Sequence, residues 1–294
     1  MLRALFATAL VAGLIAGPSA LAADETYTLK LYKSKKGDKT ENEKTEESKN
    51  SIAINVMGTN NKQEVDSGKK EIYTEEILEK KEGDKKATKL TRTYSAAEKT
   101  EKGETAKFLY AGETVLIEKK GDKYEFSVKG KALKQDEAPD LYKSFNKDDE
   151  PQSEDFMPAG PVKVGETWKV AADKTEKMFK SLGDDKMKVD VKKSTVSGKL
   201  LKAYKKDDAQ FGTLELTIEV FVTEIDLGGD FAKTKAGSKM TIKATVDTCI
   251  DGSVQFEDGK MDVKVEIGAE LPNGGSFGIT GTSTGVEKTR AAKK

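Results

Sequence analysis

Alternation of apolar and polar residues with a period of two is the feature that most limits what this chain can fold into. Apolar residues occupy every second position from Leu214 to Val222, and Glu or Thr occupies most positions between them. This is the pattern of a strand with one face on a core and the other in water. The same alternation recurs in the segments 27–31, 52–56, 124–128, 187–191, 240–246 and 261–267. Because their second faces are polar, the sequence predicts antiparallel pairing.

Turn residues separate many of these segments. A Gly-Asp pair flanked by lysines occurs at 37–38, 83–84 and 121–122, and Asp-Gly pairs occur at 251–252 and 258–259. Glycine and aspartate tolerate the positive φ of tight turns, so each pair predicts a hairpin tip. Lysines beside such tips keep hairpin ends soluble, and we interpret the repeated pattern as structural and not as a binding repeat.

Two short helices are expected. Residues 173–182 carry apolar side chains at helical spacing, with Asp173 as a cap and Glu176 as its capping-box partner; a weaker helical pattern covers 140–147. The strongly charged segments 35–50 and 97–105 are predicted to be long loops or the exposed ends of hairpins. The fold class that follows is mainly β, with about ten strands in a curved antiparallel sheet or half-barrel, or in two related sheets, and one or two short helices covering a face.

The N-terminus has the pattern of a secretory signal peptide. Arg3 precedes an apolar run from Leu5 to Ile15, and the small residues Ala20 and Ala22 form a cleavage site. We therefore predict a signal peptide over 1–22 and an exported protein, periplasmic or extracellular. No later segment approaches the roughly 20 apolar residues of a membrane-spanning helix.

The remaining chain divides at an acidic, proline-containing segment. We predict a β-rich N-terminal half over 23–147, a linker over 148–160 and a β-rich C-terminal half over 161–290. The sequence leaves open whether the two halves form one continuous sheet or two domains.

The chain contains no histidine, which removes many kinds of chemistry. Ser-His-Asp and Cys-His catalysis and the common zinc sites all require an imidazole. Ser-x-x-Lys matches at 67–70 and 144–147 are expected by chance in so lysine-rich a chain. We expect no enzyme, and no catalytic, cofactor-binding or metal-binding residue. The single cysteine, Cys249, permits no internal disulfide and follows an alternating run, so it is expected to be a strand thiol near the core.

The charges of the chain are balanced, with 51 basic and 51 acidic residues. Nucleic-acid binding requires a basic surface, so a nucleic-acid partner is not expected. Only three of the basic residues are arginines, the type that clamps anions with two parallel hydrogen bonds. We interpret the lysines as a solvated surface.

The segment from Met157 to Trp168 reads Met-Pro-Ala-Gly-Pro-Val-Lys-Val-Gly-Glu-Thr-Trp. Its prolines stiffen the approach to a turn at Gly165 and Glu166, and Trp168 begins a strand that can anchor the second half. The segment resembles the Pro-Val-x-x-Gly-(Asp/Glu)-x-Trp segment of a group of uncharacterised secreted bacterial β-proteins, and this resemblance implies no activity. More distantly, strand spacing and helix placement are similar to the half-barrel lipoprotein carriers of the periplasm. That similarity implies a curved sheet around an apolar cavity for acyl chains.

These observations favour a non-enzymatic protein of the cell envelope that binds or carries a lipid or another apolar ligand, or that binds another envelope protein. The alternative is a structural or protein-interaction module; a hydrolase using carboxylates or a Ser-Lys pair is a third reading. If a cavity exists, the segment 173–182 is its predicted lid. The residues that either line the cavity or simply form the core are Trp168, Phe179, Leu216, Ile218, Val220, Ile242, Val246, Val263 and Val265.

Overall fold

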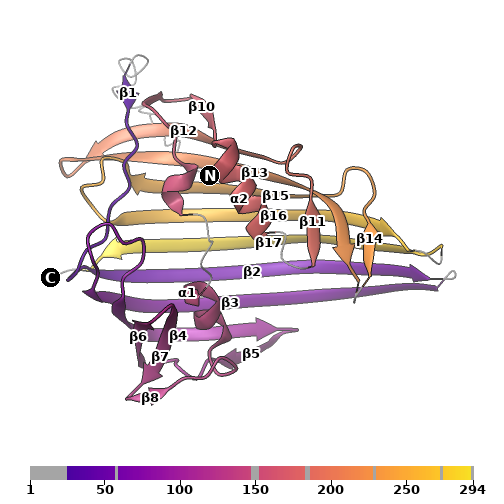
Figure 1. Cartoon of the computed structure of the whole chain (residues 1–294), viewed down its shortest axis with the longest axis horizontal. Helices are drawn as coiled ribbons and strands as arrows, with labels where there is room; N and C mark the ends of the chain where they lie inside the picture. Colours follow the sequence, from indigo (N-terminus) through magenta and orange to yellow (C-terminus); the bar gives the residue numbers. More distant parts are fainter. Residues whose placement is uncertain are drawn as a thin grey trace, which may run out of the picture.

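The protein is mainly β and folds around one open, curved antiparallel sheet, as the sequence predicts (Figure 1). The computed structural model describes residues 25–56, 59–146, 152–182, 186–227, 230–271 and 274–292. The predicted signal peptide over 1–22, residue 147 at the end of the predicted N-terminal half and residues 148–151 of the predicted linker lie outside the described residues.

Fifteen strands in the described part of the chain belong to the sheet. In spatial order its main path is β10 (Thr167–Lys169), β12 (Thr195–Lys206), β13 (Ala209–Asp226), β15 (Lys239–Cys249), β16 (Phe256–Glu270), β17 (Ser276–Ala291), β2 (Lys39–Val56), β3 (Thr59–Glu79), β4 (Lys89–Glu101), β6 (Thr114–Lys120), β7 (Lys123–Val128) and β8 (Lys131–Ala132). Beside this path, β5 (Glu104–Lys107) pairs with β4, and β11 (Met187–Val189) and β14 (Phe231–Lys233) pair with β13. A separate small pair joins β1 (Thr26–Tyr27) to β9 (Val162–Lys163).

The two halves of the chain share this sheet. The last strand, β17, pairs with β2 in unbroken register from Ser276 opposite Asn55 to Ala291 opposite Thr40. The sequence left open whether the two halves form one continuous sheet or two domains. The structure has one continuous sheet, in which the last strand, β17, joins the two halves by pairing with β2.

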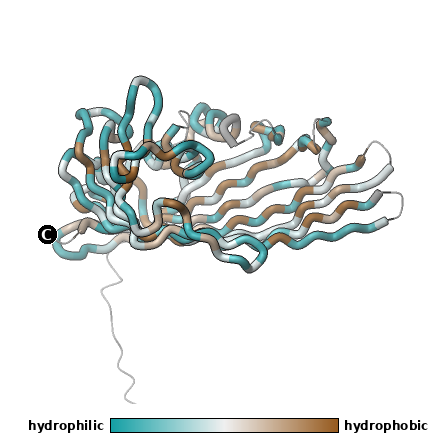
Figure 2. Tube along the Cα trace, turned by 90° about the horizontal axis from the view of Figure 1, so that it is seen from below, coloured by the Kyte–Doolittle hydropathy of each residue, from teal (hydrophilic) through white to brown (hydrophobic). Residues whose placement is uncertain are grey.

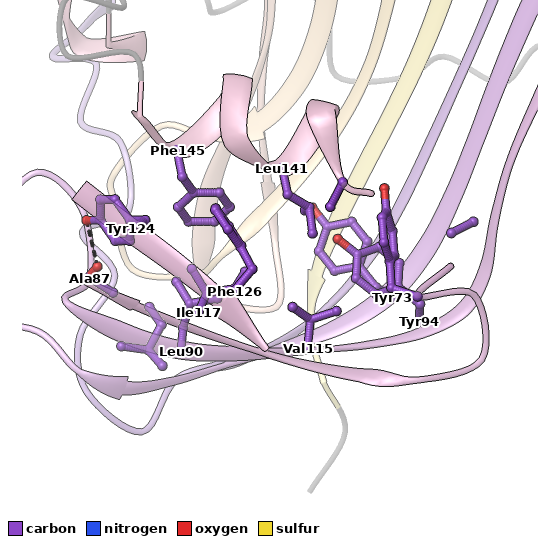
Figure 3. Close-up of a cluster of buried hydrophobic side chains, with 14 residues drawn as sticks. Tyr73, Ala87, Leu90, Tyr94, Val115, Ile117, Tyr124, Phe126, Leu141 and Phe145 are labelled. Carbon is purple, nitrogen blue, oxygen red and sulfur yellow. Dashed lines mark hydrogen bonds between the residues drawn. The ribbon is translucent and has the colours of Figure 1, made fainter. Parts of the chain in front are cut away.

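Both helices pack on the same side of the sheet, which we name the inner face. Leu141 and Phe145 of α1 (Pro139–Asn146) belong to a core with side chains of β3, β4, β6 and β7 (Figure 3). Met178 and Phe179 of α2 (Ala172–Leu182) pack against Val220 of β13 and its neighbours. A 3₁₀ turn, η1 (Ser153–Phe156), lies between the helices in sequence. Both helix predictions are confirmed within a residue at each end, although Asp173 lies inside the first turn of α2 and not before it.

The end of β13 supplies a third cover for the inner face. Val222 and Ile225 of β13, with Ala232 of β14, pack against Ile267 and Ala269 of β16. A hydrogen bond from the Lys235 amide to the Gly268 carbonyl, 2.6 Å long, fixes the connection after β14 to the same strand. The inner face is thus covered by α1 on one side and by α2 on the other. The short strands β11 and β14 cover it near one end of the long strands.

Several local predictions are corrected by the structure. The charged segment 35–50 is mostly the strand β2, because paired strands on both sides satisfy its backbone. The charged segment 97–105 is instead the largely exposed end of the hairpin of β4 and β5, which is one of the two alternatives predicted for it. The pair Asp258-Gly259 lies inside β16, where Gly259 is paired on both sides and is no hairpin tip. The expected strand 27–31 is regular only at β1. The glycines of the other four predicted turns, Gly37, Gly83, Gly121 and Gly252, do adopt positive φ.

Candidate binding groove

A groove follows the inner face between the two helices. It consists of three adjoining hollows of about 310, 300 and 470 Å³. The first and second share Val246 and Glu257 as lining residues, and the second and third share Lys44, Lys69 and Glu71. The groove therefore crosses β15, β16, β17, β2 and β3 at the middle of the sheet.

Small residues leave the space of the second hollow. Gly259 of β16 stands opposite Val246 of β15, and Gly285 of β17 stands opposite Met261 of β16. A Cβ atom on Gly285 would lie 3.5 Å from the end of the Met261 side chain, so a larger residue there would occupy the hollow. Ala244 and Val246 complete its apolar wall. The absence of side chains at Gly259 and Gly285 thus keeps this part of the inner face hollow.

An apolar strip leads away from this hollow along β16. Met261, Val263 and Val265 share the inner face, and the distance from Gly259 to Val265 is about 20 Å at the rise of a strand. Met261 is 38% exposed, whereas Val265 packs against the cluster at the end of β13. Figure 2 shows the same alternation of hydrophobic and hydrophilic residues along the neighbouring long strands. The strip is long enough for an extended alkyl chain.

Charged side chains line the bottom of the groove near Gly259, at the end of the strip. The Lys44 ammonium of β2 pairs with the Glu287 carboxylate of β17. The Lys69 ammonium of β3 lies 3.1 Å from a Glu71 oxygen and 2.9 Å from an Asp140 oxygen of α1. Tyr110 donates a hydrogen bond of 3.2 Å to Glu71; burial, with the Glu71 charge, raises the pKa of this tyrosine and keeps it a neutral donor. These contacts fix α1 over the sheet.

Glu257 of β16 differs from the other charged groups of the groove. Its half-buried carboxylate has no hydrogen bond and no ion pair among the described residues. Burial raises the pKa of Glu257, the nearby Glu287 raises it further, and Lys44 opposes the shift. Desolvating a carboxylate without a partner is unfavourable, so this side chain is poorly satisfied in the structure.

The third hollow is also lined by Arg92, whose guanidinium is enclosed by neighbouring side chains. The Arg92 guanidinium lies 2.8 Å from a Glu75 oxygen and 4.6 and 4.8 Å from the ring centres of Tyr73 and Phe145. A planar guanidinium suits this arrangement between two rings. Arg92 is therefore part of the packing under α1.

The nine apolar residues singled out from the sequence are divided between core and groove. Trp168, Phe179 and Val220 are buried in the core, and the Trp168 indole donates a 2.8 Å hydrogen bond to the Phe156 carbonyl. Leu216 and Val246 line the first hollow. The other four residues are half-buried on the inner face: Ile218, Ile242, Val263 and Val265. The predicted lid, α2, covers the core residues and not the second hollow.

Sequence reasoning missed the polar floor of the groove. At Lys44, Glu71, Glu257 and Glu287 the inner face carries charged residues, so a pattern of apolar residues does not identify these positions as inward-facing. The usable signal was the pairing of glycine with charged residues in β16 and β17, which is visible only when the register is known.

Other candidate chemistry from the sequence is not brought together. Ser67 and Lys70 are three residues apart in β3 and point to opposite faces of the sheet; Lys147 of the second Ser-x-x-Lys match lies outside the described residues. Cys249 is buried at the end of β15, as predicted. In the part of the chain that the structure describes, no cluster of three metal-ligating side chains occurs and no helix could cross a membrane.

No protein-family model matches the chain, and a search of curated proteins finds no significant match.

Proposed function

We propose that the chain is an exported, non-enzymatic protein of the bacterial envelope whose inner face binds an apolar chain, such as the chain of a lipid. The observation that carries the proposal is the second hollow together with the strip that continues it. Paired strands give this surface a fixed shape, glycines leave it open, and Met261 is exposed on it. Binding sites for small ligands are commonly concave and apolar, with few polar groups.

Export rests on the signal-peptide pattern of residues 1–22. The similarity to half-barrel lipoprotein carriers, noted from strand spacing and helix placement, is consistent with a ligand on the inner face of a curved sheet.

A second candidate function is supported by the outer face of the same sheet. Charged pairs lie across and along its strands, among them Lys288 with Glu43 at 3.4 Å and Lys260 with Asp262 at 3.1 Å. Such a surface suits contact with another charged envelope component. Charge contacts of this kind weaken as salt rises, whereas capture of an apolar ligand does not.

Native mass spectrometry tests the proposal on the chain from Ala23 onward, purified from its own envelope. Extra mass of lipid size that is lost on denaturation is the expected result. A bare chain under gentle conditions, together with no binding of a fluorescent alkyl probe, would contradict the proposal and favour the interaction module.

Two glycines of β17 provide a matched pair of variants for the probe experiment. Gly285→Val puts a branched side chain into the hollow and is expected to abolish binding of the alkyl probe. Gly278→Val changes the other face of the same strand and should leave binding of the probe unchanged. A Cβ atom on Gly278 would lie 3.9 Å from the Ile267 carbonyl oxygen, which is the nearest atom beyond its chain neighbours. Valine favours strands, so neither change is expected to unfold the sheet.

A further inference from the structure

The geometry points to an amphiphile with a cationic amine head as the ligand of the groove, with the ammonium beside Glu257 and the alkyl chain along Met261, Val263 and Val265. The inference deepens the proposed function and rests on it, because it names the chemical class of ligand for the same surface.

Glu257 is the first reason for a cationic head. Its carboxylate is half-buried on a strand between Thr248 and Thr289 of the neighbouring strands, and it has no ionic or hydrogen-bonding partner among the described residues. A group in that position gains more from an added cation than an exposed carboxylate does, because burial weakens its solvation and screening by water. A ligand ammonium would supply the missing partner.

The balance of charge around the second hollow is the second reason. Four carboxylates line it, from Glu46, Glu71, Glu257 and Glu287, and the inner face supplies two ammonium groups, from Lys44 and Lys69. Both lysines are already paired, Lys44 with Glu287 and Lys69 with Glu71 and Asp140. Lys260 also lines the hollow but pairs with Asp262 on the outer face. The surplus is negative, which disfavours an anionic head and favours an ammonium.

The apolar strip along β16 is the reason to expect an alkyl chain on the cationic ligand. Glu257 lies two residues before Gly259 on the same face of β16, and Met261, Val263 and Val265 follow in line. One extended molecule can therefore place its charged end at the polar floor and its chain on the strip. The absence of a three-ligand cluster among the described residues gives a bare metal ion no comparable site.

Competition with three single-chain amphiphiles of equal length tests the inference on the chain from Ala23 onward. Dodecylammonium, dodecanol and dodecanoate are each titrated against a bound fluorescent alkyl probe, with the two ionic competitors kept below their micelle concentrations and dodecanol below its solubility limit. We expect dodecylammonium to bind best. Glu257→Gln should weaken it by roughly tenfold to a hundredfold, the value of a hydrogen bond to a charged group, and should leave dodecanol unchanged.

Glu266→Gln is the matched control, because Glu266 lies on the exposed face of the same strand; it should leave all three affinities unchanged. Circular dichroism of each variant confirms that the sheet is intact. Equal affinities for the three heads, a preference for dodecanoate, or an unchanged affinity of Glu257→Gln for dodecylammonium would overturn the inference and leave the proposed function standing. If no amphiphile displaces the probe and Gly285→Val has no effect on the probe, the proposed function fails as well.

Discussion

The side of the inner face under α1 and the groove at the middle of the sheet are built from different residue types. Under α1, the rings of Tyr94, Phe126 and Phe145 belong to one buried cluster (Figure 3). The Tyr124 hydroxyl donates a hydrogen bond of 2.9 Å to the Ala87 carbonyl, and the Arg92 guanidinium packs against aromatic rings. In the groove, glycines replace large side chains and Glu257 has no partner among the described residues.

Under the proposed function, the α1 side supplies stability and the groove supplies binding. A packed aromatic cluster gains free energy from burial and gives no access to a ligand. A surface with glycines, an exposed Met261 and a carboxylate without a partner among the described residues gives up that gain; under the proposed function, these groups contact the ligand. The predictions below test this division by changing one side against the other.

Removing a ring from the α1 core should have the largest effect. Phe126 is 1% exposed and contacts Tyr142 and Phe145, with ring centres 4.7 and 5.7 Å away. We expect Phe126→Ala to lower the free energy of unfolding by about 3 to 5 kcal/mol. Met261→Ala in the groove removes an exposed side chain and should cost less than about 1 kcal/mol. Urea unfolding monitored by circular dichroism compares them; equal losses would show that the groove is packed as a core.

Breaking the enclosed ion pair should come next. Arg92→Met leaves Glu75 without its partner at a site where both side chains are about one-fifth exposed, 18% and 22%. We expect a loss of about 2 kcal/mol, below the 3 to 5 kcal/mol of a fully buried pair because some solvent reaches it. The control is Lys120→Met, which breaks an exposed pair with Glu125 and should leave the free energy of unfolding nearly unchanged, because solvent screens exposed charges. A loss for Arg92→Met no larger than that of the control would contradict the enclosed arrangement.

Gly198 tests whether every glycine of the sheet opens space for a ligand. It stands opposite Trp168, and a Cβ atom there would lie 2.7 Å from the indole nitrogen and closer still to two ring carbons. We expect Gly198→Ala to displace the indole, weaken its hydrogen bond to Phe156 and cost about 1 to 3 kcal/mol. Gly278→Ala meets no such atom and should be near neutral. Thermal unfolding with tryptophan fluorescence gives both numbers, and an unshifted emission for Gly198→Ala would contradict the contact.

The sequence predicted the strands that alternate apolar with polar residues, and it missed the charged residues of the inner face. β13, β15 and β16 alternate apolar with polar residues, so their faces follow from periodicity alone. The first two thirds of β2 are polar on both faces, and the place of β2 beside β17 depends on contacts more than 200 residues apart in sequence, such as Thr289 with Asn42. Likewise, no local pattern distinguishes Gly259, which stands between two strands, from a turn glycine such as Gly121.

The smallest effect should be on the pH dependence of stability, and it concerns Glu257. Because burial and Glu287 raise its pKa in the folded protein, with Lys44 opposing, the folded state binds the proton more tightly than the unfolded chain does. The stabilisation from that proton is complete below the pKa of the unfolded chain and is lost as the pH rises through the raised folded value. Glutamine stays neutral at every pH. Glu257→Gln should therefore match the parent in acid and be the more stable at neutral pH, whereas Glu266→Gln should show no such gain. Urea unfolding at a series of pH values measures the difference, and curves for Glu257→Gln and the parent that stay parallel would mean that the carboxylate is already satisfied without a ligand.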